Sequence, residues 1–262
     1  MEPRPKIYTY DSNFFDYIEM GAQRSARVVT RLLLAHLPIK SVLDVGCGRG
    51  VWLDEWAKQG GVEILGVDGS YVEPDRLVVP THAFRSANLA EPLDLDRRFG
   101  LVQSLEVAEH IPEQAADVFV QNLIAHGDRV LFSAAPPGQG GEFHVNEQSY
   151  DYWRDKFAQH GYCLIDFVRP EILNQSAVEP WYRYNTLLFV RSQTIETLPA
   201  HLRASISDPH KPVKDYAPLT WRIRRAVLSR LPGPVVAWMV KIKHSIVLTL
   251  HRFKTRRSST LA

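Results

Sequence analysis

The fold of this chain is decided by one stretch, Ser41-Val42-Leu43-Asp44-Val45-Gly46-Cys47-Gly48-Arg49-Gly50. An apolar run gives way here to three glycines at alternate positions, and a helix-like segment follows over residues 51–59. A second apolar run, Val62-Glu63-Ile64-Leu65-Gly66-Val67, then ends in Asp68. This order predicts a strand, a tight glycine turn, a helix and a second strand with a carboxylate at its tip. Such a unit suits a nucleotide-shaped ligand, because the glycines let it approach the backbone and the carboxylate can bind both ribose hydroxyls.

The spacing and order of these residues narrow the ligand. Asp68 lies twenty residues after Gly48, the separation expected of the acidic residue in a nucleotide-binding βαβ unit. Dinucleotide-binding turns usually read Gly-x-Gly-x-x-Gly and place a pyrophosphate at the helix N-terminus. Here Asp44 precedes the first glycine and the order is Asp-x-Gly-x-Gly-x-Gly. A carboxylate beside the turn suits a ligand with an ammonium and a sulfonium group, and would repel a pyrophosphate.

The pattern resembles the first motif of class I S-adenosylmethionine-dependent methyltransferases. Members of that family commonly have an acidic residue near the position of Asn88, where it touches the adenine. The Asn88 side-chain oxygen can still accept a hydrogen bond from the exocyclic amine. The resemblance implies a set of residues that bind S-adenosylmethionine: Asp44, Gly46, Gly48, Gly50, Asp68, Asn88, Leu89 and Ser104.

Alternating strand and helix patterns favour an α/β fold with a Rossmann-like, seven-stranded doubly wound sheet. The resemblance implies that the last strand is antiparallel and that the helical lead-in closes over the cofactor near residues 20–24. Further strands are predicted over residues 82–87, 99–105, 129–134, 162–168 and 181–190, with a helix over 114–126. The predicted organisation is a helical lead-in over 1–40, a methyltransferase domain over 41–191, a linker over 192–219 and a basic amphipathic helical tail over 220–262.

Length and cysteine content agree with such a protein. The 262 residues are enough to bury one large core and carry an appendage. Cys47 and Cys163 fall in different predicted elements, which indicates a reducing compartment rather than a disulfide framework. The first residues lead into no apolar segment typical of secretory signals, so a cytoplasmic location is expected.

A second group of chemically suggestive residues follows the fourth predicted strand, in Leu105-Glu106-Val107-Ala108-Glu109-His110. If this segment is helical, Glu106, Glu109 and His110 share one face. His144 follows the fifth predicted strand, which would bring it to the same edge of the sheet. Two carboxylates and two imidazoles at one edge form a candidate divalent-metal site.

This pattern resembles the metal-dependent 2′-O-methyltransferases of small-RNA 3′ ends, in which Mg²⁺ bridges both hydroxyls of a terminal ribose. The resemblance implies that Glu106, Glu109, His110 and His144 bind Mg²⁺ or Mn²⁺. A bound cation would lower the pKa of a sugar hydroxyl, which is otherwise a poor nucleophile. Two alternatives stay open: a metal-free general base at His110 or His144, and a purely structural role. The residues predicted to take part in catalysis are His110, His144 and Glu109.

Several features bear on the substrate. The loop over residues 136–141, rich in proline and glycine, is predicted to be a mobile active-site flap, with a passive surface loop as the alternative. Aromatic and amide side chains over residues 144–153 and 181–185 suit sugar rings or nucleobases, although core packing would also use them. This arrangement resembles methyltransferases of bacterial cell-surface polysaccharide assembly. The expected function is therefore O-methylation of a glycan or glycolipid.

Three other functions are considered: an RNA 3′-terminal 2′-O-methyltransferase, a methyltransferase of a small molecule or lipid precursor, and a non-catalytic scaffold. The scaffold is disfavoured because Asp44, Gly46, Gly48 and Asp68 are intact. Nucleic acid is disfavoured because residues 1–215 hold 21 basic and 29 acidic residues, a formal charge of −8 that repels a phosphate backbone.

The tail differs sharply in charge, since residues 216–262 contain ten Lys or Arg and no Asp or Glu. Two helices are predicted, over 220–231 and 235–257, separated by Pro232-Gly233-Pro234. The second has an apolar stripe opposite basic residues and is too charged to span a bilayer. It is expected to lie on an anionic membrane surface, at the inner face of the membrane. Docking on its own domain, a dimer interface and nucleic-acid binding are the alternatives.

Overall fold

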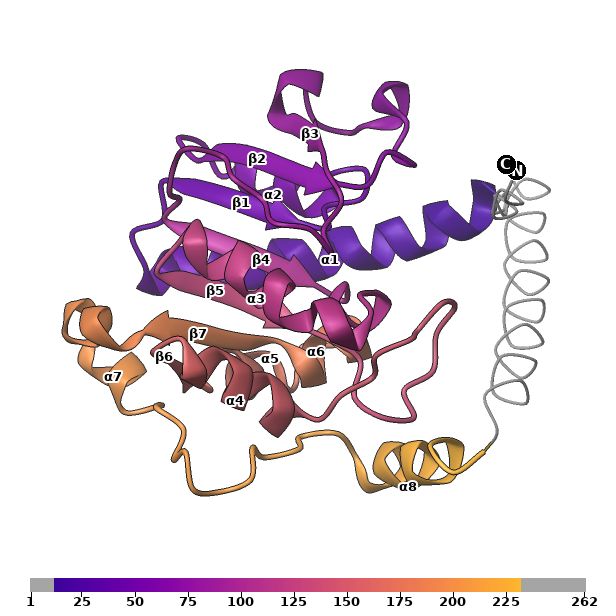
Figure 1. Ribbon diagram of the computed structural model, residues 1–262, viewed down its shortest axis with the longest axis vertical. Helices are drawn as coiled ribbons and strands as arrows, with labels where there is room; N and C mark the ends of the chain where they lie inside the picture. Colours follow the sequence, from indigo (N-terminus) through magenta and orange to yellow (C-terminus); the bar gives the residue numbers. More distant parts are fainter. Residues whose placement is uncertain (1–11, 232–262) are drawn as a thin grey trace, which may run out of the picture.

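The computed structural model describes residues 12–231 of the chain, which form one sheet with helices on both faces (Figure 1). The strands are β1 Ser41–Val45, β2 Glu63–Asp68, β3 Phe84–Ser86, β4 Leu101–Leu105, β5 Arg129–Ser133, β6 Tyr162–Ile165 and β7 Leu187–Arg191. The helices are α1 Ser12–His36, α2 Val51–Lys58, α3 Ala116–Ala125, α4 Tyr150–Gln159, α5 Val168–Ile172, α6 Pro180–Asn185, α7 Ala200–Arg203 and α8 Leu219–Leu228.

The seven strands have the order β3-β2-β1-β4-β5-β7-β6. The pairs from β3 to β5 are parallel, whereas β7 runs antiparallel to both β5 and β6. From β1 the chain therefore adds β2 and β3 on one side of the sheet, and then crosses to add β4 and the later strands on the other side of β1. The predicted Rossmann-like, seven-stranded α/β fold with an antiparallel last strand is confirmed.

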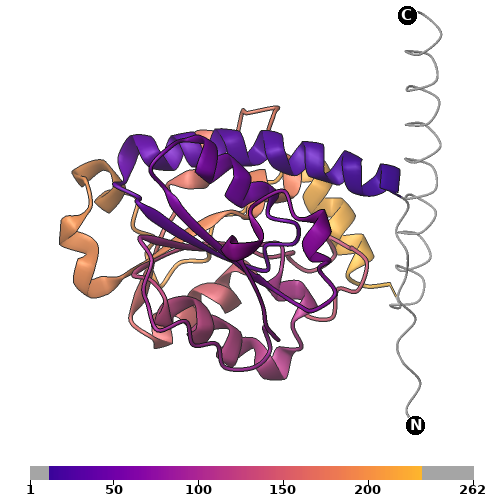
Figure 2. The same ribbon diagram turned by 90° about the horizontal axis from the view of Figure 1, so that it is seen from above.

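The central strands are apolar along their length because both of their faces are covered. Figure 2 shows α1 along one face of the sheet and α3 and α4 along the other. One buried cluster joins the sheet to α1, α2, α5 and α6, and the other joins it to α3 and α4. Trp56 of α2 is fully buried in the first cluster, and its indole Nε1 donates a 2.8 Å hydrogen bond to Gln103 Oε1 in β4. Phe157 of α4 is fully buried in the second.

One predicted strand was wrong in its first half. Residues 181–185 belong to the helix α6, and the strand β7 begins only at Leu187. Pro180 occupies the start of α6, where its fixed φ angle suits the first helical turn and its missing N–H costs no hydrogen bond. The aromatic run after it is apolar enough to be read as a buried strand, but it covers the sheet from outside.

The residues predicted as a linker, 192–219, pack against the domain. They include a 3₁₀ turn, Ser192–Thr197, and the short helix α7. Leu198, Leu202 and Val213 are buried, and the Ser207 amide donates a 2.9 Å hydrogen bond to the Leu164 carbonyl of β6. The next helix, α8, matches the predicted helix over 220–231 closely, whereas the predicted helix over 235–257 lies outside the described residues. None of the helices within residues 12–231 has the length and apolar character needed to cross a membrane.

Candidate active site

The turn after β1 is built around glycines that adopt conformations other residues avoid. The φ angles of Gly46, Gly48 and Gly50 are 89°, 53° and 87°, values that only glycine adopts without strain. The Gly46 amide donates a 2.7 Å hydrogen bond to the Val67 carbonyl at the end of β2. A Cβ at position 46 would also collide with the Val107 side chain. The turn is therefore held tightly between the ends of β2 and β4.

Asp68 joins the tip of β2 to this turn. Its carboxylate accepts hydrogen bonds from the Gly48 amide at 2.6 Å and the Gly69 amide at 2.7 Å, and also from the Tyr71 hydroxyl. A carboxylate has about four acceptor positions, so these three bonds do not exhaust it. A Cβ on Gly48 would meet no atom within 4 Å. The turn at Gly48 thus borders open space into which a ligand can fit, whereas Asp68 itself is buried.

Asp44 lies in β1 just before the turn and is almost completely buried. Its burial raises the pKa of the carboxyl group to about 7, an effect that the neighbouring Gln103 amide opposes and the Asp68 carboxylate reinforces. A buried carboxylate next to a second one is a favourable place for a cationic group.

The remaining residues predicted to bind the cofactor differ in exposure. Asn88 is exposed beyond β3, where its Oδ1 accepts a 3.1 Å hydrogen bond from the Ala90 amide and its Nδ2 donates to Glu91. Leu89 is buried in the core cluster beside α3 and α4. Ser104 of β4 is fully buried, and its hydroxyl has no hydrogen-bond partner among the described residues.

The segment after β4 does not form the α-helix that a shared helical face of Glu106, Glu109 and His110 would require. Glu106 has a φ angle of 58°, in the left-handed region. Its amide donates to the carbonyl and the hydroxyl oxygen of Ser133 in β5, at 2.9 and 3.0 Å. Only a 3₁₀ turn, Ala108–His110, follows. The chain is therefore tied to the neighbouring strand instead of starting a helix at Glu106.

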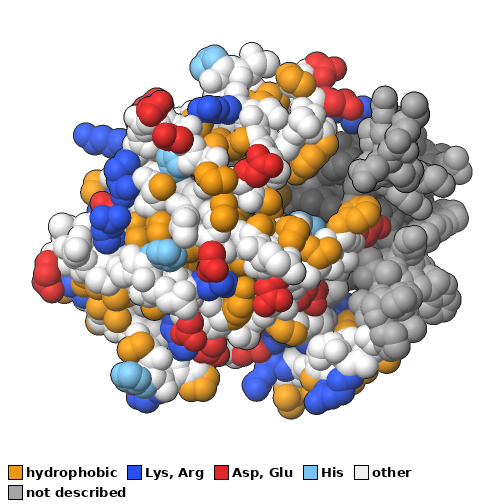
Figure 3. Space-filling view, in the orientation of Figure 1, with side chains coloured by type: hydrophobic (Ala, Val, Ile, Leu, Met, Phe, Trp, Pro, Cys, Tyr) orange, Lys and Arg blue, Asp and Glu red, His pale blue; other side chains and the backbone are white. Residues whose placement is uncertain are grey.

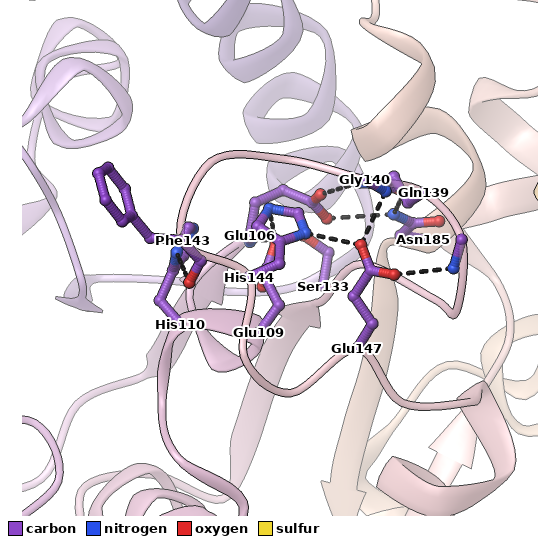
Figure 4. A network of polar contacts seen from close by, with 11 residues as sticks. Glu106, Glu109, His110, Ser133, Gln139, Gly140, Phe143, His144, Glu147 and Asn185 are labelled. Atoms are coloured by element: carbon purple, nitrogen blue, oxygen red, sulfur yellow. Dashed lines mark hydrogen bonds and ion pairs between the residues drawn. The ribbon is translucent and has the colours of Figure 1, made fainter. Parts of the chain in front are cut away.

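The structure nevertheless brings three of the four predicted metal ligands together (Figure 4). One potential ligand atom from each of Glu109, His110 and His144 lies within 4.8 Å of the others. His144 Nε2 is 4.0 Å from Glu109 Oε1, and the centroids of the two imidazole rings are 4.9 Å apart. Glu109 Oε2 is buried and has no hydrogen-bond partner among the described residues. A carboxylate oxygen in that situation is well suited to bind a cation.

The fourth predicted ligand, Glu106, is held in a separate network. Its carboxylate accepts hydrogen bonds from Gln139 Nε2 at 2.8 Å and Asn185 Nδ2 at 3.2 Å. Asn185 Nδ2 also donates to Gln139 Oε1 at 2.9 Å. Burial raises the pKa of Glu106, and burial together with the charge of Glu106 raises that of Glu109 well above its usual range. A cation between these groups would offset the cost of keeping both ionised.

Glu147, which was not predicted as a site residue, orients His144. It accepts hydrogen bonds from the amides of Gly138 and Gly140, both at 2.7 Å, and from His144 Nδ1 at 2.8 Å. A Cβ on Gly141 would collide with the His144 ring. The loop over residues 136–141 thus wraps around Glu147 and leaves Nε2 of His144 facing Glu109. The only sequence signal for this role is the three-residue spacing between His144 and Glu147.

Comparison with known proteins agrees with this fold. The methyltransferase domain family matches residues 17–175, which is more than half of the chain. This chain belongs to that family.

A ubiquinone biosynthesis O-methyltransferase from Alkalilimnicola ehrlichii is 27% identical over 192 residues, covering 67% of this chain and 71% of that protein. Among solved structures, a putative O-methyltransferase from Nostoc punctiforme aligns with a TM-score of 0.51 and 12% identity, covering 68% of this chain and 58% of that one. The S-adenosylmethionine-bound magnesium protoporphyrin IX methyltransferase from Synechocystis has a TM-score of 0.49 and 22% identity, covering 71% and 87%.

The family match makes this protein a methyltransferase, and its described residues fit S-adenosylmethionine as the methyl donor. The open space beside Gly48 can take a ligand, and the three hydrogen bonds to Asp68 leave an acceptor position for a ribose hydroxyl. The buried Ser104 hydroxyl has no partner within residues 12–231. Asp44 and Asp68 supply negative charge near a cationic ligand. When bound, the cofactor supplies an electrophilic methyl group on a sulfonium.

The Asp68 carboxylate is expected to contribute strongly to cofactor affinity. Asp68→Ala should weaken S-adenosylmethionine binding by about 1.5–3 kcal/mol, the range for hydrogen bonds to charged groups. Tyr71→Phe is the matched control, because it removes one hydrogen bond to the carboxylate and leaves the carboxylate in place. Calorimetry should show affinity at least equal to wild type for Tyr71→Phe. Unchanged affinity in Asp68→Ala, or tight binding of NAD by the wild type, would contradict this assignment.

Asp44 is expected to lower the free energy of unfolding as the pH rises. Its folded-state pKa of about 7 exceeds its ordinary value of 3.8, so the unfolded chain releases this proton first and stability falls between about pH 4 and pH 7. As the pH rises from 5 to 8, the free energy of unfolding of Asp44→Asn should therefore increase by about 2–3 kcal/mol relative to that of the wild type. The variant should also lose affinity for S-adenosylmethionine. Urea unfolding of both proteins at the two pH values measures this difference. An equal change of stability with pH in the wild type and in Asp44→Asn would refute the prediction.

Proposed function

We propose that this methyltransferase transfers the methyl group to a hydroxyl oxygen of a glycan or glycolipid, and that Glu109, His110 and His144 bind a divalent cation beside the acceptor. The observation that supports this proposal best is the convergence of one carboxylate and two imidazoles at the carboxyl ends of β4 and β5. This edge also carries the glycine turn that fits the cofactor. The acceptor and the sulfonium methyl group would therefore meet there.

The pair formed by Glu109 and His144 suits a cation in size and chemistry. Two ligands of one cation at about 2.0–2.2 Å cannot lie more than about 4.4 Å apart, and the 4.0 Å between Glu109 Oε1 and His144 Nε2 meets this limit. The hydrogen bond from His144 to Glu147 fixes the ring, as carboxylates hydrogen-bonded to metal-binding histidines do. A cation here would lower the pKa of an acceptor hydroxyl and orient it. Three protein ligands leave coordination positions for two adjacent hydroxyls, which many sugars offer.

A hydroxyl of a lipid precursor is the second candidate acceptor. The similarity to a ubiquinone biosynthesis O-methyltransferase favours it. So do Phe143 and Val145, which flank His144 and are each 65% exposed. The Phe143 carbonyl oxygen lies 3.3 Å from His110 Nδ1, so Phe143 is next to the site. An apolar acceptor would reach the site past the Phe143 side chain. An RNA 3′ end is a weaker candidate because of the negative charge of residues 1–215.

Metal binding is expected to depend on Glu109 and His144. The wild type should bind Mn²⁺ in calorimetry, and both Glu109→Gln and His144→Ala should lower this affinity by more than about tenfold. Tenfold is the low end for losing a group that only supports a ligand, and these two are proposed as ligands. Glu106→Gln should have a smaller effect, because its oxygens are already hydrogen-bonded to Gln139 and Asn185. Methyl transfer should stop with EDTA and return with Mg²⁺ or Mn²⁺.

The control is His160→Ala, which removes an exposed histidine beyond α4 and should leave Mn²⁺ affinity unchanged. If EDTA leaves activity intact and the wild type binds no Mn²⁺, the cation is refuted and a metal-free base at His110 or His144 replaces it.

The acceptor class can be tested with labelled S-adenosylmethionine and three sets of soluble acceptors: sugars with adjacent hydroxyls, catechols, and short RNAs with a free 3′-terminal diol. The glycan proposal predicts transfer to the sugars that exceeds transfer to the other two sets. Exclusive labelling of catechols would support the lipid-precursor candidate. Exclusive labelling of RNA would contradict the argument from charge.

A further inference from the structure

The helix α8 has its apolar face turned toward solvent. Leu219, Ile223 and Val227 follow one another at four-residue steps and are 67%, 55% and 55% exposed. Four-residue steps place side chains along one side of a helix. The three aliphatic side chains therefore form a single exposed stripe, the α8 stripe.

The opposite side of α8 fixes the helix to the domain. Arg225 and Leu228 are buried, and Arg225 forms an ion pair with Asp215. Trp221 packs edge-on against Tyr184 of α6, with ring centroids 5.6 Å apart. The α8 stripe is thus presented outward by a docked helix. The described residues leave the apolar side of this docked helix uncovered.

Basic side chains flank the α8 stripe. Arg222, Arg224 and Arg230 are all exposed, and the chain contains no Asp or Glu after Asp215. Arg222 Nε lies 3.8 Å from Asp215 Oδ2, whereas Arg224 donates a hydrogen bond to the Gln139 carbonyl. Figure 3 shows Lys or Arg and hydrophobic side chains next to one another over α8, at the lower right of the molecule. Aliphatic residues between arginines are the pattern of a helix that lies in an anionic lipid interface.

We propose that α8 docks this methyltransferase on an anionic membrane surface, with the α8 stripe between the lipid head groups and the flanking arginines against their phosphates. A second copy of the chain fits less well. Stable protein interfaces bury about 800 Å² on each partner, far more than three aliphatic side chains on one short helix offer. The arginines would also face one another across a two-fold contact through this helix.

Docking through α8 would bring the active-site loop close to the lipid surface. A Cβ on Gly138 would collide with the Arg225 carbonyl of α8, so loop and helix are in close contact. Arg224 Nη1 reaches the Gln139 carbonyl at 3.4 Å, and the Gln139 side chain binds Glu106. A groove of about 480 Å³ lies between Leu219 and Ile223 of α8 and the start of the loop at Pro136. A lipid-linked acceptor would thereby meet the proposed catalytic residues. This extension rests on the proposed function, whereas the docking itself does not.

The test is sedimentation of the full-length protein with phosphatidylcholine vesicles that contain or lack phosphatidylglycerol. The variant Leu219→Ser/Ile223→Ser/Val227→Ser removes only exposed apolar groups. It should bind the phosphatidylglycerol vesicles at least about tenfold more weakly than wild type, because apolar insertion drives interfacial binding. Arg222→Gln/Arg230→Gln should also weaken binding, and should make what remains less sensitive to salt.

The matched control is Val78→Ser/Ile206→Ser, which removes two apolar side chains that are each 41% exposed elsewhere on the surface. It should bind vesicles like wild type. Calorimetry with S-adenosylmethionine shows whether each variant is folded, and Leu219→Ile/Ile223→Leu/Val227→Leu should keep vesicle binding.

Wild-type binding by the triple serine variant would overturn the proposal. The proposal would also be overturned if the triple serine variant kept its vesicle binding but sedimented at a different velocity from wild type without vesicles. That result would assign the stripe to contact with a second copy of the chain. Because the vesicle assay needs no acceptor and no cation, its failure is distinguishable from failure of the proposed methyl transfer.

Discussion

The active site depends on the backbone hydrogen bonds that pair β1 with β2 on one side and with β4 on the other. In this register Asp44 lies between Gly66 of β2 and Gln103 of β4. All three strands are parallel, so their carboxyl ends meet at one edge of the sheet. The glycine turn, Asp68 and the segment over residues 106–110 are therefore neighbours, although more than fifty residues separate the first from the last. The pairing that stabilises the fold also assembles the site.

A second level of organisation comes from the loop after β5. Its glycine amides converge on Glu147, and Glu147 in turn holds His144 against Glu109. The same loop carries Gln139, which bonds to Glu106, and it is covered on its other side by α8. The predicted flap is thus partly buried and hydrogen-bonded on both sides. Through this loop Glu106, Glu109 and His144 are connected physically to the helix that carries the exposed α8 stripe.

Local patterns predicted the part of the structure that local chemistry determines. The β1-turn-α2-β2 unit follows from apolar runs, glycines and one carboxylate, and the structure shows each within one or two residues of its predicted bounds. The proximity of Glu109 and His144 followed from the rule that neighbouring parallel strands end together. The left-handed conformation of Glu106 could not be predicted, because it depends on hydrogen bonds to Ser133 on another strand. The role of Glu147 likewise depends on how a glycine loop folds around it.

The central claim is that Glu109, His110 and His144 form one cation site beside the cofactor. Anomalous diffraction from crystals grown with Mn²⁺ and S-adenosylmethionine tests it most directly. The account predicts a manganese peak within about 2.0–2.2 Å of the Glu109 carboxylate and of one nitrogen of each imidazole, at the same edge of the sheet as the cofactor. A fully bound cofactor with no peak between these three side chains, or with manganese bound only elsewhere, would contradict it.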